Sequence, residues 1–228
     1  AKARRKASPS AALWRILPGT MVITYHGGQC FKVSFGSTTL AFDPISKQSK
    51  RFSPAKFGAD IALVSVWHPD CNGVEQVTHA GKQPFRIDGP GEYEIGEVTV
   101  RGFEVPTQYG GGDGLASIYQ VRLEDMTLLF LGAVSDPAAL DQSVLADIAE
   151  VDILFLPIGG GDLMEVPQAS KLAVKLEANL VIPMHYDKAA LASFLKEEGA
   201  DGVKPVEKLT LKKRDVAAMS GEVAVLSS

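Results

Sequence analysis

Short stretches of alternating apolar and polar residues dominate the first half of the chain, and they predict β-strands. Residues 30–35 (CFKVSF) alternate in this way, and a Gly36-Ser37 turn leads into a second strand over residues 38–44. Residues 60–66 (DIALVSV) are nearly all apolar, as expected for a strand buried on both faces. The same criteria predict single strands over residues 21–25, 117–123 and 126–132. They also predict two or three short strands within residues 84–105.

Helices and strands alternate in the remainder of the chain. Residues 136–150 have helical spacing and begin with Asp136-Pro137, an N-cap followed by a first-turn proline. Two more helices and four strands follow by the same reading: helices over residues 166–178 and 187–200, buried strands over 151–158 and 179–186, and edge strands over 208–213 and 222–228. Strands first and alternating elements later predict one domain over residues 21–228, with two sheets and helices outside them.

Residues 1–20 differ from the rest because they carry five positive charges and no acid. They lack the long apolar region of a secretory signal. We expect a basic extension that is disordered or not native; a basic arm for an acidic partner and a targeting signal are the alternatives.

Composition narrows the class of protein. The net charge is −4, which gives no general attraction to nucleic acid, and no apolar run is long enough to span a membrane. The only two cysteines, Cys30 and Cys71, cannot form a disulfide framework, so we expect a cytoplasmic protein. A small-molecule ligand is the expected partner, and the predicted edge strands are compatible with a homo-oligomer.

Candidate chemistry lies at the ends of apolar strands. Asp43 follows one strand, the loop His68-Pro69-Asp70-Cys71 follows another, and His185 ends a third. Strand ends that meet at one sheet edge are where α/β folds build sites. Histidine, aspartate and cysteine are all zinc ligands, so the sequence raises the question of a metal centre.

Several segments resemble the metallo-β-lactamase superfamily, in particular its compact bacterial and archaeal branch of proposed zinc-dependent hydrolases, related to the ascorbate-phosphate lactonases. They are ITYHGGQCF (23–31), AFDP (41–44), RIDGPGEYEIGEVTVRGFEV (86–105), FLPIGGG (155–161) and VIPMHY (181–186). The resemblance implies an α/β fold, an αββα sandwich with a metal site at one edge between two sheets.

The family binds one or two metals through His-x-His-x-Asp-His, a mid-chain histidine, a bridging aspartate and a final histidine. This resemblance places possible metal ligands at His68, Asp70, Cys71 and His185, with Cys71 standing where a histidine belongs. Asp43 matches a residue that orients a ligand.

Three further ligand positions of the family have lost their donors, at Val66, Thr107 and Ala133, and the opening Gly-His position reads Gly28. His26 is displaced by two residues from the position that Gly28 occupies. The loss of the bridging aspartate at Ala133 argues against two-metal catalysis.

Three functional hypotheses follow. The first is a fold that has lost its metals and serves as a binding or structural module, with Trp67 filling the vacated space. The second is a single-zinc hydrolase of small esters, lactones or phosphoesters that uses Asp70, Cys71 and His185, with Asp43 or Asp70 as general base. The third is anion or nucleotide binding by the glycine-rich segments 110–114 and 158–163, which are more simply a flexible loop and a close turn.

The other candidate residues have ordinary structural interpretations. His79 is expected on the surface, Cys30 in the core, and Tyr93 in turn or core packing. His26 is expected to be a hydrogen-bonded core residue, although it could also compensate for the histidine missing at Gly28.

Overall fold

The computed structural model describes residues 19–228. The expected basic extension therefore lies outside the described residues, apart from Gly19 and Thr20, and Thr20 is already buried. The strands are β1 (Met21–Tyr25), β2 (Phe31–Phe35), β3 (Thr38–Phe42), β4 (Ile61–Leu63), β5 (Phe85–Ile87), β6 (Gly91–Ile95), β7 (Val98–Thr107), β8 (Gly114–Leu123), β9 (Met126–Phe130), β10 (Ile153–Pro157), β11 (Leu180–Met184), β12 (Leu209–Leu211) and β13 (Glu222–Val223). The α-helices are α1 (Gln142–Asp147), α2 (Val166–Leu176), α3 (Lys188–Glu197) and α4 (Lys213–Val216), with 3-10 helices η1 (Val74–Val77) and η2 (Pro137–Ala139).

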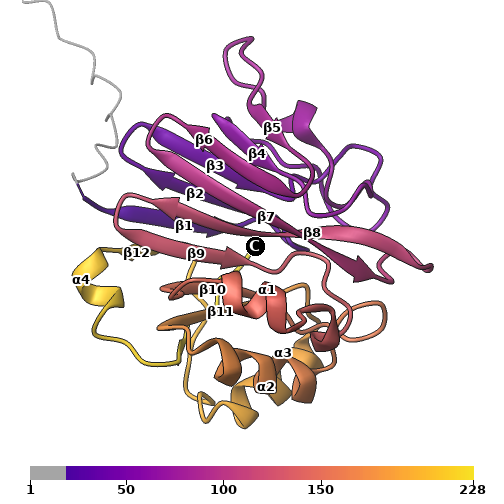
Figure 1. Cartoon of the computed structure of the whole chain (residues 1–228), viewed down its shortest axis with the longest axis vertical. Helices are drawn as coiled ribbons and strands as arrows, with labels where there is room; N and C mark the ends of the chain where they lie inside the picture. Colours follow the sequence, from indigo (N-terminus) through magenta and orange to yellow (C-terminus); the bar gives the residue numbers. More distant parts are fainter. Residues whose placement is uncertain (1–18) are drawn as a thin grey trace, which may run out of the picture.

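The strands form two mixed sheets that lie face to face (Figure 1). The first has the order β12-β1-β2-β3-β4-β5 and the second β13-β11-β10-β9-β8-β7-β6. Parallel pairing joins β3 to β4, and β9 to β10 to β11. The carboxyl ends of these central strands therefore lie at corresponding edges of their sheets, where strand-end residues can meet.

Aromatic side chains fill the space between the sheets. Phe31 and Phe42 from the first sheet pack against Phe155 from the second, with ring centroids 4.8 and 5.6 Å apart, and all three are fully buried. Rings at these spacings contribute packing energy beyond the area that they bury. The two sheets thus share one apolar core.

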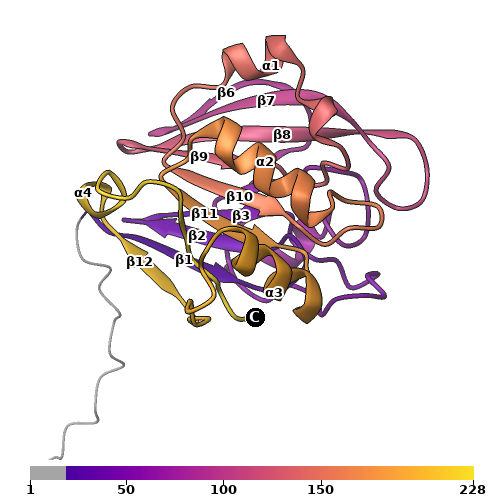
Figure 2. The same ribbon diagram turned by 90° about the horizontal axis from the view of Figure 1, so that it is seen from below.

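The outer faces of the two sheets are covered differently. Figures 1 and 2 show α1, α2 and α3 together on the outer side of the second sheet. There, Ala169, Leu172 and Ala173 of α2 are buried in a second apolar cluster. The first sheet is covered mainly by the irregular segment 44–60 and η1, which bury residues such as Ile45 and Ala55. The predicted α/β class with two packed sheets is confirmed, although α-helices are concentrated on one face.

Several predicted elements were too long, such as the edge strand expected over residues 222–228, which is only Glu222–Val223, and two of the differences have a clear local cause. The helix expected over residues 136–150 is divided into η2 and α1, because Asp141 provides a second N-cap and accepts hydrogen bonds from Ser143 and Val144 nitrogens. The strand expected over residues 60–66 ends at Leu63, since the Ser65 amide donates to the side chain of Asp43 and not to a neighbouring strand.

Three single-residue expectations can be compared with the fold. Cys30 is fully buried in the core and His79 is exposed, as predicted. Tyr93 is half-buried, packs against the core and donates to the carbonyl of Gly89. Within residues 19–228, the helices are all too short or too polar to cross a lipid bilayer.

Candidate functional site

The predicted site residues meet at one edge of the sandwich, between the two sheets. Asp43 follows β3, the loop with His68, Asp70 and Cys71 follows β4, and His185 follows β11. The His185 nitrogen donates to the carbonyl of Gly28, 2.8 Å away, which ties the end of β11 to the β1–β2 turn. Asp43 (φ 41°) and His185 (φ 50°) both adopt the left-handed conformation, which is uncommon for residues other than glycine but enriched for aspartate and histidine.

Asp43 is fully buried and belongs to the support of the site. The Ser65 backbone nitrogen and hydroxyl each lie 2.6 Å from one of its carboxyl oxygens. Burial raises the pKa of Asp43 to about 7, while the two contacts with Ser65 lower it. At and below neutral pH this carboxyl therefore tends to hold its proton.

Asp70 is 2% exposed and has a donor on each oxygen. The Ser49 hydroxyl donates to Oδ1 at 2.6 Å, and the Tyr109 hydroxyl donates to Oδ2 at 3.0 Å. His68 Nδ1 lies 3.6 Å from Oδ2 and accepts from the Asp70 backbone nitrogen. The carboxylate is thus held by hydroxyl groups.

His185 is 6% exposed and has a nitrogen group at each side of its ring. Nη2 of Arg51 lies 3.1 Å from Nε2, and the side-chain amide of Gln29 lies 3.3 Å from Nδ1. A neutral imidazole has one lone pair, and a guanidinium can only donate, so Arg51 takes the lone pair on Nε2. The proton is then on Nδ1, which needs an acceptor. A half-turn of the Gln29 amide places its oxygen, in place of its nitrogen, beside Nδ1.

The charge state of His185 supports this assignment. Burial, and then the positive charge of Arg51, lower its pKa to about 4. The imidazole is therefore neutral at pH 7 and can accept from Arg51.

Cys71 is fully buried beneath these residues. Its Sγ lies 3.6 Å from the side-chain amide of Gln29, so Gln29 bridges Cys71 and His185. Burial, followed by the nearby carboxyl groups of Asp43 and Asp70, raises the pKa of Cys71 well above its usual value. With no metal ion beside it, the thiol is therefore neutral.

Tyr109 occupies the space between the two histidines. Its ring meets His68 and His185 edge-on, with centroid distances of 5.2 and 5.5 Å. Thr107 and Ala133, which stand where the family has metal ligands, are joined by a hydrogen bond. The Thr107 hydroxyl donates to the Ala133 carbonyl. The side chains of this site are therefore joined through Tyr109, Gln29 and Arg51.

Two alternative interpretations, one for Trp67 and one for His26, do not agree with the structure. Trp67 does not fill vacated space, because its side chain is 67% exposed and lies under Arg86 on another face of the loop. His26 does not replace the missing histidine: its ring meets that of Phe57 at a tilt, with centroids 4.6 Å apart, and it bonds to the hydroxyl of Thr24. A side chain at Gly28 would also be obstructed, since a Cβ there would lie 3.0 Å from the ring of Phe52.

The two glycine-rich segments meet at this edge. The Gly110 nitrogen donates to Oδ2 of Asp162 at 3.0 Å, which links segment 110–114 to segment 158–163. Gly110 also lies against His68, since a Cβ there would come 3.3 Å from that ring. Gly110 is thus anchored beside the site, while residues 110–114 are all exposed.

Comparison with known proteins identifies the family. A model of the β-lactamase superfamily domain matches residues 22–185. The chain belongs to the metallo-β-lactamase superfamily. A UPF0173 metal-dependent hydrolase from Natranaerobius thermophilus is 24% identical over 192 residues, which cover 73% of this chain and 84% of the relative. A relative with the same description from Carboxydothermus hydrogenoformans is 27% identical over 197 residues, with 73% and 85% covered.

Solved structures agree with this assignment. A proposed zinc-dependent hydrolase of the metallo-β-lactamase superfamily from Thermotoga maritima superposes with a TM-score of 0.69 and 25% identity, covering 90% of this chain and 98% of that one. The metallo-β-lactamase fold protein YhfI from Bacillus subtilis gives a TM-score of 0.60 at 12% identity, covering 92% and 97%. The family is thus one of metal-dependent hydrolases, and the second likeness shows the fold alone.

Four residues of this metallo-β-lactamase site were missed at the level of sequence: Gln29, Ser49, Arg51 and Tyr109. None of them stands at a ligand position of the family motif. The polar run KQSKR (47–51) beside the Asp43-Pro44 pair is the only signal that could have indicated Ser49 and Arg51. Tyr109 precedes the glycines that were read as a loop.

The hydroxyl of Tyr109 is expected to stabilise the folded protein. Tyr109→Phe removes a hydrogen bond to a buried carboxylate, which costs about 2 kcal/mol in the free energy of unfolding. Urea denaturation at pH 7 measures the loss. Tyr186→Phe, whose hydroxyl bonds to the neutral carbonyl of Leu226, is the matched control and should cost about 1 kcal/mol or less. Equal losses in the two variants would contradict a charged Asp70.

Proposed function

We propose that this chain is a metal-independent member of its family, a cytoplasmic protein that binds a small anionic molecule at the site edge and carries out no two-metal hydrolysis. The observation that carries the proposal is the contact of Arg51 Nη2 with His185 Nε2, at 3.1 Å. This contact places a permanent positive charge beside a histidine that metal-dependent relatives would use as a ligand.

Arg51 opposes metal binding in two ways. A guanidinium does not lose its proton in proteins, so its charge repels a divalent cation at any working pH. Its hydrogen bond also consumes the lone pair of Nε2 that would have to bind the metal.

The remaining donors do not fit a metal ion either. Both oxygens of Asp70 accept from hydroxyl groups, and the fully buried Sγ of Cys71 lies 3.6 Å from the side-chain amide of Gln29. Among residues 19–228, no three or more His, Cys, Asp or Glu side chains are grouped as a metal site would require. The single-zinc alternative with Asp70, Cys71 and His185 is therefore less well supported, since those residues do not face a common point.

An anion fits the groove beside His185. This groove has a volume of about 830 Å³, and its lining includes Arg51, Lys188 and the paired glycines Gly27 and Gly28. Arg51 can still donate from its other nitrogens, and Lys188 is exposed at the first turn of α3. A carboxylate or phosphate placed between these two cations would gain charge-assisted hydrogen bonds.

Metal content and anion binding test the proposal together. Protein purified without a chelator should hold less than about a tenth of an equivalent of zinc, iron or manganese, and added zinc should leave its melting temperature unchanged. Inorganic phosphate should raise that melting temperature. Arg51→Met should weaken the phosphate effect about tenfold, whereas Arg214→Met, an exposed arginine on α4, should not.

Stoichiometric metal would overturn the proposal. If that metal were lost in Cys71→Ala, the single-metal hydrolase would take its place. An equal response to phosphate in Arg51→Met and Arg214→Met would remove the anion site.

A further inference from the structure

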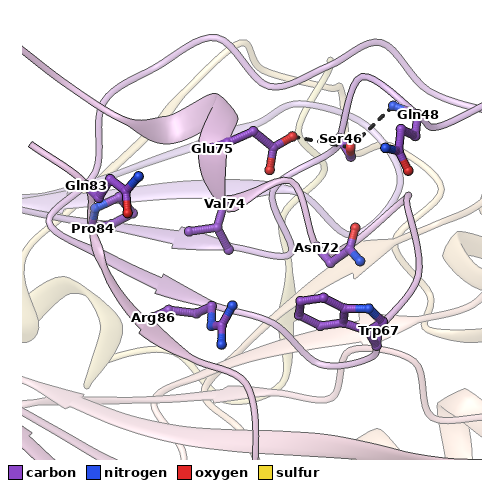
Figure 3. Close-up of a pocket in the computed structure, with 9 residues that line it drawn as sticks. All are labelled: Ser46, Gln48, Trp67, Asn72, Val74, Glu75, Gln83, Pro84 and Arg86. Carbon is purple, nitrogen blue, oxygen red and sulfur yellow. Dashed lines mark hydrogen bonds between the residues drawn. The ribbon is translucent and has the colours of Figure 1, made fainter. Parts of the chain in front are cut away.

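The loop that carries His68, Asp70 and Cys71 also borders a second pocket, with a volume of about 560 Å³ (Figure 3). None of its lining residues belongs to the groove beside His185. The loop supplies Trp67 and Asn72 to this pocket, while its metal-ligand types point into the site. Pockets of this size hold small ligands.

Trp67 offers a flat apolar surface to the pocket. Its side chain is 67% exposed, and the guanidinium of Arg86 lies 5.5 Å from its ring centroid (Figure 3). A cation over one face of an indole restrains the ring while it leaves other ring surface in solvent. Val74 and Pro84 add apolar surface to the same pocket.

Polar groups surround this apolar surface on separate segments. Within residues 19–228, no hydrogen bond engages the side-chain amides of Gln48, Asn72 and Gln83, which all line the pocket. Oε1 of Glu75 accepts a hydrogen bond from the Ser46 hydroxyl. Oε2 of Glu75 accepts none from the described residues 19–228. Each amide can both donate and accept. Figure 3 shows these groups around the rim and not on one side.

The charges of the pocket disfavour an anion. Arg86 is paired with Asp88, whose Oδ2 lies 3.1 Å from Nε, and Glu75 adds a negative charge. A phosphate or carboxylate would meet an acid without an unpaired cation to balance it. A neutral ligand with many hydroxyl groups suits the lining better.

We propose that this pocket binds a neutral carbohydrate. Trp67 stacks on the C–H face of one sugar ring, and the three amides and Glu75 bond to its hydroxyls. The amides and the carboxylate are distributed around the rim of the pocket, which matches the hydroxyl groups that radiate from a sugar ring. A nucleobase would instead require hydrogen-bonding groups in the plane of its ring.

The wall that carries Trp67 and Asn72 is preorganised. The Gly73 nitrogen donates to the Pro44 carbonyl at 2.6 Å, and the Ser46 nitrogen donates to the Pro69 carbonyl at 2.9 Å. Gly73 packs so closely that a Cβ would lie 2.4 Å from the Ser46 nitrogen. A rigid wall reduces the ordering cost of binding, which matters for a shallow polar pocket.

Tryptophan fluorescence tests the proposal. The Trp14→Phe variant leaves Trp67 as the only tryptophan, because the chain has two. Cellobiose, maltose and N,N′-diacetylchitobiose are titrated, with adenosine and inorganic phosphate as comparison ligands. A saturable change with at least one disaccharide, and none with the comparison ligands, is expected.

Calorimetry with the disaccharide that binds then locates the site. Trp67→Ala and Glu75→Gln should each weaken binding about tenfold or more, whereas Leu115→Ala, an exposed residue outside the pocket, should leave it unchanged. Arg51→Met should also leave it unchanged, which separates this site from the proposed anion groove. The proposal fails if no disaccharide gives a saturable response, if adenosine alone does, or if Trp67→Ala binds as tightly as the parent.

Discussion

Gly159→Ala is expected to destabilise the protein by about 3 kcal/mol or more, because there is no room for a methyl group at this position. A Cβ on Gly159 would lie 1.9 Å from the carbonyl oxygen of His185. That oxygen belongs to backbone that is already held, since the His185 nitrogen donates to Gly28 and the Ile158 nitrogen donates to Met184. Relief of the clash must separate the ends of β10 and β11 or displace His185.

Urea denaturation of the parent and the variant measures this loss. Gly112→Ala is the matched control in the other glycine-rich segment, because its Cβ would meet no atom within 4 Å. That substitution should change the free energy of unfolding by no more than about 0.5 kcal/mol. A Gly159→Ala protein as stable as the control would mean that the approach of Gly159 to His185 is not needed.

The contrast between these glycines shows what sequence patterns can and cannot establish. The sequence indicated a flexible loop for segment 110–114 and a close turn for segment 158–163, but it did not identify His185 as the residue that Gly159 approaches. The strands were predictable because they are indicated by alternating apolar and polar residues, or by short apolar runs, which can be recognised within a few consecutive residues. The errors occurred where a side chain competed with the regular pattern: Asp141 restarts a helix, and Asp43 takes the amide hydrogen of Ser65.

The site shows the same limit at a longer range. Asp43 and His185 were expected at a common edge, because parallel strands end there, and the structure places them there. Arg51 was not expected, since it lies 134 residues from its partner His185 and arginine is no metal ligand. Nothing in local sequence indicates which side chain occupies the space between two histidines, and here it is Tyr109.

Under the proposed metal-independent function, these side chains explain how the family fold can persist. A ligand cluster with no metal leaves buried polar groups that require partners, and each one without a partner costs free energy. Here Ser49 and Tyr109 satisfy Asp70, and Arg51 and Gln29 satisfy His185. These hydrogen bonds supply the partners that the proposed metal-independent site requires.

Asp43→Asn is expected to reveal a pH dependence of stability that the parent conceals. The pKa of His185 is about 4 in the folded protein, below its ordinary value of 6.5, so between these pH values only the unfolded chain takes up a proton there. Stability from this group therefore rises with pH, by up to about 3 kcal/mol across the window. The pKa of Asp43 is about 7, above its ordinary value of 3.8, so the folded state holds a proton that the unfolded chain has released. Stability from Asp43 consequently falls as pH rises, and the two effects oppose each other.

Asparagine removes the second effect with little change in shape. It tolerates the left-handed backbone at position 43 and can keep both contacts with Ser65, as a protonated aspartate does. Urea denaturation at several pH values between 4 and 7 should give a nearly flat stability profile for the parent and a rising profile for Asp43→Asn. The double variant Asp43→Asn, His185→Gln should be flat again, because the histidine that supplies the slope is gone. A rising profile that survives in the double variant would assign the slope to other groups and refute a neutral, buried His185 as its source.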